Sequence, residues 1–83
     1  MRTIKTASGA VYTLTDEGKV HRQEGRTSIS NTNYGNQYTD GFINEMCGEP
    51  EVGNSFVWMG VMNDYTEPIW SSEIVSIEET DTL

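Results

Sequence analysis

Short runs of β-branched and aromatic residues, separated by turn-forming residues, make up the first third of the chain. Residues 3–7 and 10–14 are two such runs. The Ser-Gly pair at 8–9 between them indicates a hairpin, because glycine accepts the positive φ of a primed turn. A second turn at 16–18 leads into a third run at 19–22. Such closely spaced turns favour an antiparallel meander over βαβ units.

The later part of the chain predicts two longer strands. The run 56–62 is apolar at alternate and intervening positions, which suits a strand covered on both faces. Asn-Asp at 63–64 turns the chain towards a last strand at 69–77. The apolar residues of that strand cannot all face one side under strict alternation. A β-bulge at 71–72 would reconcile them.

Two segments between these strands differ in composition. Residues 27–41 are rich in Ser, Thr, Asn, Gly and Tyr, which predicts a long polar loop with the composition of a binding loop. A polar and partly disordered excursion is the alternative interpretation. In 40–47, apolar side chains at i, i+1, i+4 and i+5 fit one face of a short helix, although a strand also fits so short a segment.

Together these elements predict an all-β or β-rich α+β fold. We expect a small, open, antiparallel barrel of five or six short strands, with one possible short helix at 40–47. A single β-rich domain at 1–77 includes the polar loop, and 78–83 form an acidic tail. With 83 residues the chain is one domain at most.

Basic residues are confined to the start of the chain. All five lie within the first 26 positions: Arg2, Lys5, Lys19, Arg22 and Arg26. From residue 27 onwards there are ten acids and no Lys or Arg, and the net charge is −8. A surface of one sign repels nucleic acids and membranes and attracts basic proteins. Ten acids are too few to imitate a DNA duplex, which carries about 18 charges over ~30 Å.

The sequence contains no enzymatic or metal-binding motif. His21 and Cys47 are the only residues of their types, too few for a structural zinc site. Carboxylate pairs at 49/51 and 78/79 fall in segments expected to be solvated, where no pocket raises a pKa. We therefore expect no catalytic residue, no metal and no cofactor.

Cysteine use and hydropathy suggest a cytoplasmic protein. The single cysteine excludes an internal disulfide, which fits a reducing compartment. No secretory signal is expected at the start of the sequence. The longest apolar run, 56–62, is far shorter than the ~20 residues of a membrane-spanning helix.

Aromatic and acidic residues outside the first strands are the candidate partner contacts. Tyrosine provides contact area at low entropic cost, and carboxylates attract basic partners. The candidates are Tyr34, Tyr38, Asp40, Glu45, Glu49, Glu51, Asp64, Glu67, Trp70 and Glu73. A second set offers apolar area: Met46, Trp58, Met59, Met62 and Trp70. Most of this second set should be core, leaving one Trp and one or two Met accessible.

Four segments, 3–12, 17–22, 50–56 and 70–77, resemble small proteins encoded by bacteriophages and prophages. The likeness lies in the pattern of turns and strands. It implies a small SH3-like or similar β-barrel with a role in the phage–host contest. There, short acidic proteins bind and disable host machinery, including nucleic-acid-binding defence systems, as anti-CRISPR proteins do. The resemblance implies no particular functional residue.

The leading hypothesis is a non-enzymatic protein that binds and inhibits or modulates a host protein with a basic surface. It would act in the host cytoplasm through its acidic surface and its Tyr/Asn-rich loop. One alternative is a structural or assembly protein of a phage particle, self-associating as a homodimer through Trp58 and Trp70. Another is a nucleic-acid-binding barrel that uses Lys5, Lys19 and Arg22, which the net charge of −8 disfavours. The partner, the oligomeric state, the order of the loop and the spatial fate of the charge split stay open.

Overall fold

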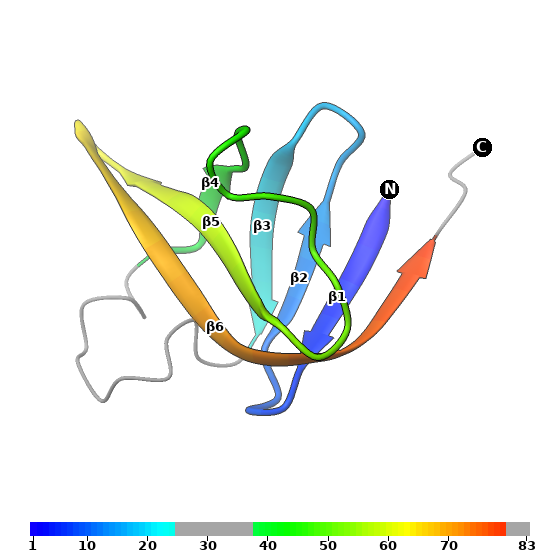
Figure 1. Ribbon diagram of the computed structural model, residues 1–83. Coiled ribbons are helices and arrows are strands. Elements are labelled where there is room, and N and C mark those ends of the chain that lie inside the picture. The colour runs from blue at the N-terminus through cyan, green and yellow to red at the C-terminus, as the bar shows by residue number, and fades with distance from the viewer. Residues whose placement is uncertain (25–37, 80–83) are drawn as a thin grey trace.

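The computed structural model describes residues 1–24 and 38–79 of the chain. Within them, six antiparallel strands form a closed barrel (Figure 1). The strands are β1 (Arg2–Thr6), β2 (Val11–Leu14), β3 (Lys19–Glu24), β4 (Asp40–Phe42), β5 (Ser55–Met62) and β6 (Tyr65–Glu79). They follow one another around the barrel in chain order, and β6 pairs with β1 to close it. The prediction of a small antiparallel barrel is confirmed, but the barrel is closed where an open one was expected.

The two predicted turns join the first three strands. Across the first turn, β1 and β2 pair Ile4 with Tyr12. Gly9 and Gly18 have φ angles of 91° and 89°, in the left-handed region that favours glycine. In the second turn the backbone N–H of Lys19 donates to the Thr15 hydroxyl at 3.0 Å. The hairpin signals in the sequence are therefore confirmed.

β6 closes the barrel because its two halves pair with different strands. Residues 65–73 pair with β5 and residues 74–79 pair with β1, so the strand sweeps from one to the other in Figure 1. Near the end of the half that pairs with β5, Ser71 and Ser72 lie opposite the single residue Phe56. This is the predicted bulge, which bends the strand. The Phe56 N–H donates to the buried Ser71 hydroxyl at 2.7 Å, and that hydroxyl donates to the Ser72 carbonyl at 2.6 Å.

Two large aromatic side chains fill the barrel opposite a pair of glycines. Trp58 is 0% exposed and Tyr38 is 1% exposed. Gly41 and Gly60 pair across β4 and β5. A Cβ on Gly41 would lie 2.7 Å from the Trp58 ring, and one on Gly60 would lie 2.8 Å from the Tyr38 ring. Both distances are shorter than real Cβ contacts, so the rings occupy space that only glycine leaves free.

The rest of the core comes from every strand except β4. Its members are Ile4, Ala10, Tyr12, Leu14, Val20, Phe56, Ile69 and Ile74. The Tyr12 ring meets the Phe56 and Trp58 rings edge to face, with centroids 5.1 and 5.7 Å apart. Burial raises the pKa of Tyr12 to about 12. Tyr12 therefore acts as a neutral core residue at physiological pH.

Residues 40–47 form no helix, so that prediction is wrong. Phe42 ends β4, where it pairs with both neighbouring strands. The Asn44 side-chain carbonyl then accepts hydrogen bonds from the amides of Met46 at 3.0 Å and Cys47 at 3.3 Å. This is the geometry of a helix N-cap, but only one turn follows it, closed by the Cys47 N–H donating to the Asn44 carbonyl at 3.0 Å. Gly48 comes next with a φ of 75°, a left-handed conformation that ends a helical turn. The apolar spacing reflects the end of a strand followed by a tight turn.

Two predicted boundaries shift by a few residues. β4 begins at Asp40, inside the predicted polar loop 27–41. β6 continues to Glu79, so the strand ends later than expected and includes the start of the predicted acidic tail. Residues 25–37 and 80–83, which hold most of the loop and of the tail, lie outside the described residues.

Replacing Gly41 with alanine should destabilise the protein more than replacing Gly60. At Gly41 the new methyl group would collide with the backbone carbonyl of Met59, whereas at Gly60 it would meet side chains such as Tyr38. We expect a loss of about 1–3 kcal/mol for Gly60→Ala and a larger loss for Gly41→Ala, measured by urea unfolding. Thr66→Ala, on the exposed face of β6, should change stability by less than about 0.5 kcal/mol. A Gly41→Ala protein as stable as wild type would contradict this packing.

Replacing Ser71 with alanine should destabilise the protein at the bulge. The buried Phe56 N–H would lose its acceptor, which costs about 1–3 kcal/mol. Urea unfolding should show this loss, and hydrogen exchange at the Phe56 amide should accelerate. Ser55→Ala, an exposed serine on the same hairpin, is the matched control and should be near neutral. Equal stabilities of the two variants would show that the bulge does not depend on this hydroxyl.

Candidate functional site

The charge asymmetry of the sequence persists in the barrel wall. Because the strands lie in chain order around the barrel, β1 to β3 form one half of the wall and β4 to β6 form the other. Figure 1 shows β1 to β3 together in blue and cyan, β5 in yellow-green and β6 from yellow to orange. The second half with its connections, which we call the acidic half-wall (38–79), contains nine acids, five of them in strands, and no Lys or Arg. The separation of basic and acidic residues along the chain is therefore kept in the folded barrel.

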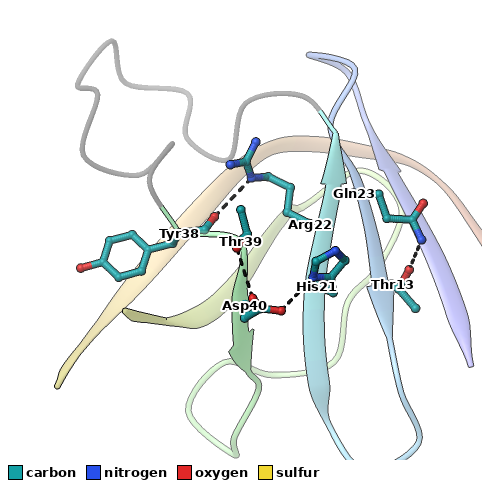
Figure 2. Close-up of polar contacts among 7 residues, drawn as sticks. All are labelled: Thr13, His21, Arg22, Gln23, Tyr38, Thr39 and Asp40. Carbon is teal, nitrogen blue, oxygen red and sulfur yellow. Dashed lines mark hydrogen bonds and ion pairs between the residues drawn. The ribbon is translucent and has the colours of Figure 1, made fainter. Parts of the chain in front are cut away.

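Ion pairs between the halves involve few of these acids. Arg2 Nη1 lies 3.3 Å from Glu49 Oε2. His21 Nδ1 lies 2.8 Å from Asp40 Oδ1 across the seam between β3 and β4 (Figure 2). The other ion pairs among the described residues lie within the first half. Among the described residues, the acids of the half-wall outside any ion pair are Glu45, Glu51, Asp64, Glu67, Glu73, Glu78 and Glu79.

Polar contacts tie β4 to β3 along the seam shown in Figure 2. The Arg22 backbone N–H donates to the Thr39 carbonyl at 2.7 Å, and its Nε donates to the Tyr38 carbonyl at 3.2 Å. The Thr39 hydroxyl donates to Asp40 at 3.2 Å. The hydrogen bond from His21, helped by that from Thr39, holds the pKa of the Asp40 carboxyl below its usual value. These contacts fasten a three-residue strand, so we assign Asp40 a structural role.

Tyr38 and Glu67, both predicted as partner contacts, are less accessible than expected. Tyr38 lies in the core, and its hydroxyl donates to Glu67 at 3.1 Å. The ring therefore cannot serve as a partner contact, and Glu67 is half-buried beside it. This corrects the interpretation of Tyr38 as a binding-loop residue. Tyr34 lies outside the described residues.

Four other predicted carboxylates are exposed but lie apart from one another. Asp40 is bound at the β3–β4 seam, and Glu49 is paired with an arginine of β1. Glu51 accepts a hydrogen bond within its own turn at 3.4 Å. Asp64 lies in the turn between β5 and β6. They give the half-wall a diffuse negative field and form no single cluster.

Of the remaining predicted residues, Trp70 lines an apolar groove on the outer face of β5 and β6. Glu45 lines a separate hollow beside the turn after β4, and Glu73 is an exposed residue of β6 that pairs with Ser55. We call the apolar groove the outer groove, and its volume is about 300 Å³. It is lined by Asn44, Met46, Cys47, Val57, Met59, Pro68 and Trp70. The turn after β4 forms one side, and the outward residues of the hairpin form the floor.

Two apolar side chains of the outer groove are accessible. Trp70 is 49% exposed and Met46 is 93% exposed. The prediction that one Trp and one or two Met remain accessible is confirmed. Trp58 is fully buried, which corrects the expectation that it takes part in self-association.

The sequence predicts half of the floor of the outer groove and misses the other half. Val57 pairs with Trp70, and Met59 pairs with Pro68, so these four side chains share one face of the hairpin. Met59 and Trp70 are in the predicted set of apolar contacts, whereas Val57 and Pro68 are not. The signal for Val57 is the run 56–62, which is apolar on both faces and predicts a strand covered on both sides, although its outer face is partly open.

The basic residues considered for nucleic-acid binding do not form one patch. Lys5 lies on β1 and Lys19 on β3, with β2 between them. Arg22 is directed to the Tyr38 carbonyl (Figure 2). Single-strand binding needs a continuous basic groove with stacking aromatics, which this arrangement does not favour.

Within the described residues, no group of three or more His, Cys, Asp or Glu side chains could hold a metal ion. No helix in the same part of the chain is long and apolar enough to cross a membrane. Comparisons of the chain with protein-family models, with curated protein sequences and with solved structures gave no match. The class of the protein is therefore defined by its fold, a small all-β barrel with one acidic half-wall.

Replacing Asp40 with asparagine should reduce stability at neutral pH but not in acid. The folded protein lowers the pKa of Asp40 below the unfolded value of about 3.9, so the carboxylate stabilises the fold above about pH 4. This contribution is lost as the pH falls through the lowered folded pKa. Urea unfolding of wild type and Asp40→Asn should differ near pH 6 and converge towards acid. The difference should be at most about 1 kcal/mol, because the pair is exposed.

The same comparison in a His21→Ala background provides the control. Removing the imidazole removes the main cause of the lowered pKa, so Asp40→Asn should then have a smaller effect. A difference between wild type and Asp40→Asn that stays constant from neutral pH into acid would contradict the assignment.

Proposed function

We propose that this chain is a non-enzymatic protein that binds a partner protein with a basic surface and modulates its activity. The observation that carries the proposal is the acidic half-wall. Of its nine acids, Asp40 and Glu49 are in ion pairs of the described residues, and Glu67 is half-buried beside Tyr38. Six exposed acids are thus left available to an outside charge. A wall of one sign steers basic partners towards itself and speeds their association.

The geometry supports a local contact and argues against imitation of a whole duplex. The molecule is 34 Å long. B-DNA of that length carries about 20 phosphate charges, against nine acids in the half-wall. We therefore propose that the protein occupies a limited basic patch on its partner, such as part of a nucleic-acid-binding groove.

The resemblance to phage-encoded proteins supports a partner from a bacterial host. Binding at a basic patch that the host protein uses for nucleic acid would inhibit that protein by competition. A host-defence protein that binds nucleic acid is the partner that accounts for both the resemblance to phage proteins and the acidic surface. The Tyr/Asn-rich loop remains part of this proposal, although most of it lies outside the described residues.

Charge reversal on each half of the wall tests the function. Tagged protein is used to capture partners from bacterial lysate at low and moderate salt, and the affinity for a purified hit is measured. A double variant, Glu45→Lys with Glu73→Lys, should weaken binding about tenfold or more, because it places positive charge against a basic partner. The matched control, Asp16→Lys with Glu17→Lys, makes the same charge change on the other half and should bind nearly as wild type. Moderate salt should also weaken the wild-type complex.

Two results would count against the function. One is the recovery of no specific protein at either salt concentration. The other is an equal effect of the two double variants, which would show that net charge matters and the half-wall does not.

A structural role through self-association is the second candidate function. The observation that favours it is the exposed apolar area of Trp70 and Met46. Light scattering over a range of concentrations separates the two functions. A monomer at every concentration would rule out the assembly role and leave the binding role unaffected.

A further inference from the structure

We infer that the outer groove is the anchor site for the partner and that it takes an apolar side chain flanked by Lys or Arg on an exposed peptide segment. This inference rests on the proposed function. It adds a place on the barrel and the chemistry of the bound segment, neither of which the charge of the half-wall specifies.

The floor of the outer groove suits an apolar group. Val57 and Trp70 pair across the hairpin, and Met59 and Pro68 pair next to them, so a continuous apolar strip faces outwards. The volume of about 300 Å³ is at the lower end of the ~300–1,000 Å³ found for ligand pockets. It therefore fits one or two side chains better than a larger ligand. Tryptophan in such a position is among the residues that contribute most to binding energy.

The wall of the outer groove combines a fixed backbone with a mobile side chain. Asn44 Oδ1 accepts hydrogen bonds from the amides of Met46 and Cys47, and from the Cys47 thiol at 3.4 Å. The turn is thus held in place by one side chain. Met46 is 93% exposed. An unbranched thioether is suited to fold over a bound group of variable shape.

The carboxylates near the outer groove set the charge of the occupant. Glu45 precedes Met46 in the chain and lines a neighbouring hollow that shares Asn44 with the groove. At the other end Glu73 pairs with Ser55, next to the Val57–Trp70 pair. Both carboxylates are exposed and neither is in an ion pair of the described residues. An anchor with basic residues on either side would satisfy both.

Charge also decides against a second copy of this chain as the occupant. Two outer grooves face to face would bring the same carboxylates together, and like charges across an interface oppose association. A basic segment of another protein meets no such repulsion. The occupant we commit to is therefore a peptide segment of a basic protein.

Three labelled synthetic peptides test the anchor directly. One has a leucine flanked by arginines, the second has a serine with the same flanks, and the third has a leucine flanked by glutamates. The first should bind about tenfold or more tightly than the second, because leucine burial adds to the electrostatic attraction. The third should not bind. Acrylamide quenching reports the place of binding, because Trp70 is exposed while Trp58 is buried, and the first peptide should protect Trp70.

Variants of the outer groove provide the second test. Met46→Ser and Trp70→Ser should each weaken the arginine–leucine peptide about tenfold and leave the arginine–serine peptide unchanged. Val75→Ser is the matched control, because Val75 is 51% exposed on the part of β6 outside the groove. Met46 is so exposed that its replacement leaves the fold intact, which keeps the test valid if the Trp70 variant is unstable.

Three results would overturn the inference. The serine peptide binding as tightly as the leucine peptide would show that attraction is electrostatic only, and the proposed function would then stand without this anchor. Unchanged affinity of Met46→Ser and Trp70→Ser would place the anchor elsewhere. Self-association that Trp70→Ser abolishes would assign the groove to a second copy of the chain. Capture from lysate decides the proposed function separately.

Discussion

Closure of this barrel depends on the fit of two aromatic rings against two glycines. Trp58 and Tyr38 occupy the space that side chains at Gly41 and Gly60 would need. β4 is only three residues long and has Gly41 at its centre, so it contributes little apolar burial of its own. It is held between β3 and β5 because the ring of Trp58 packs against its backbone and because the seam contacts fasten its ends.

The outer groove is a consequence of this interior. Side chains alternate along β5, so that placing Phe56 and Trp58 in the core directs Val57 and Met59 outwards. The bulge at Ser71 and Ser72 keeps the alternation of β6 compatible with two different partner strands. The floor of the groove is therefore the outer side of the strands that carry the core, while its wall is a turn organised by one asparagine.

Much of the fold was predictable because its signals are local. The glycine turns, the strands and the bulge each depend on a few neighbouring residues, and all were confirmed. The helix at 40–47 was not, because four apolar positions in eight residues fit a strand end and turn equally well. Pairing of residues 40–42 with β3 and β5 decided between them, and Gly48 ends the single turn that follows. This choice depends on geometry that no periodicity in the sequence encodes.

The candidate site was only partly predictable, for a different reason. Trp70 and the acids could be named from composition, but their grouping depends on which segments closure brings together. Met46 and Trp70 are 24 positions apart in the chain and meet only through the folded hairpin and turn. Tyr38 was expected to be a surface contact from the composition around it, and it is buried because the interior needs a large ring beside Gly60. The basic and acidic residues stay on different halves of the barrel because the strands follow chain order, and that order could not be predicted from the sequence alone.

Alternation along β5 and β6 has a consequence for how such a protein can evolve. Substitutions at outward positions such as 57, 59 and 70 alter the outer groove. The neighbouring inward residues Trp58 and Ser71 stay unchanged, so the core is preserved. Residues that form the core and residues that line the outer groove thus alternate along the same strands, and their side chains lie on opposite sides of the wall. If the outer groove binds a partner as we propose, its specificity can change one outward residue at a time without loss of the barrel.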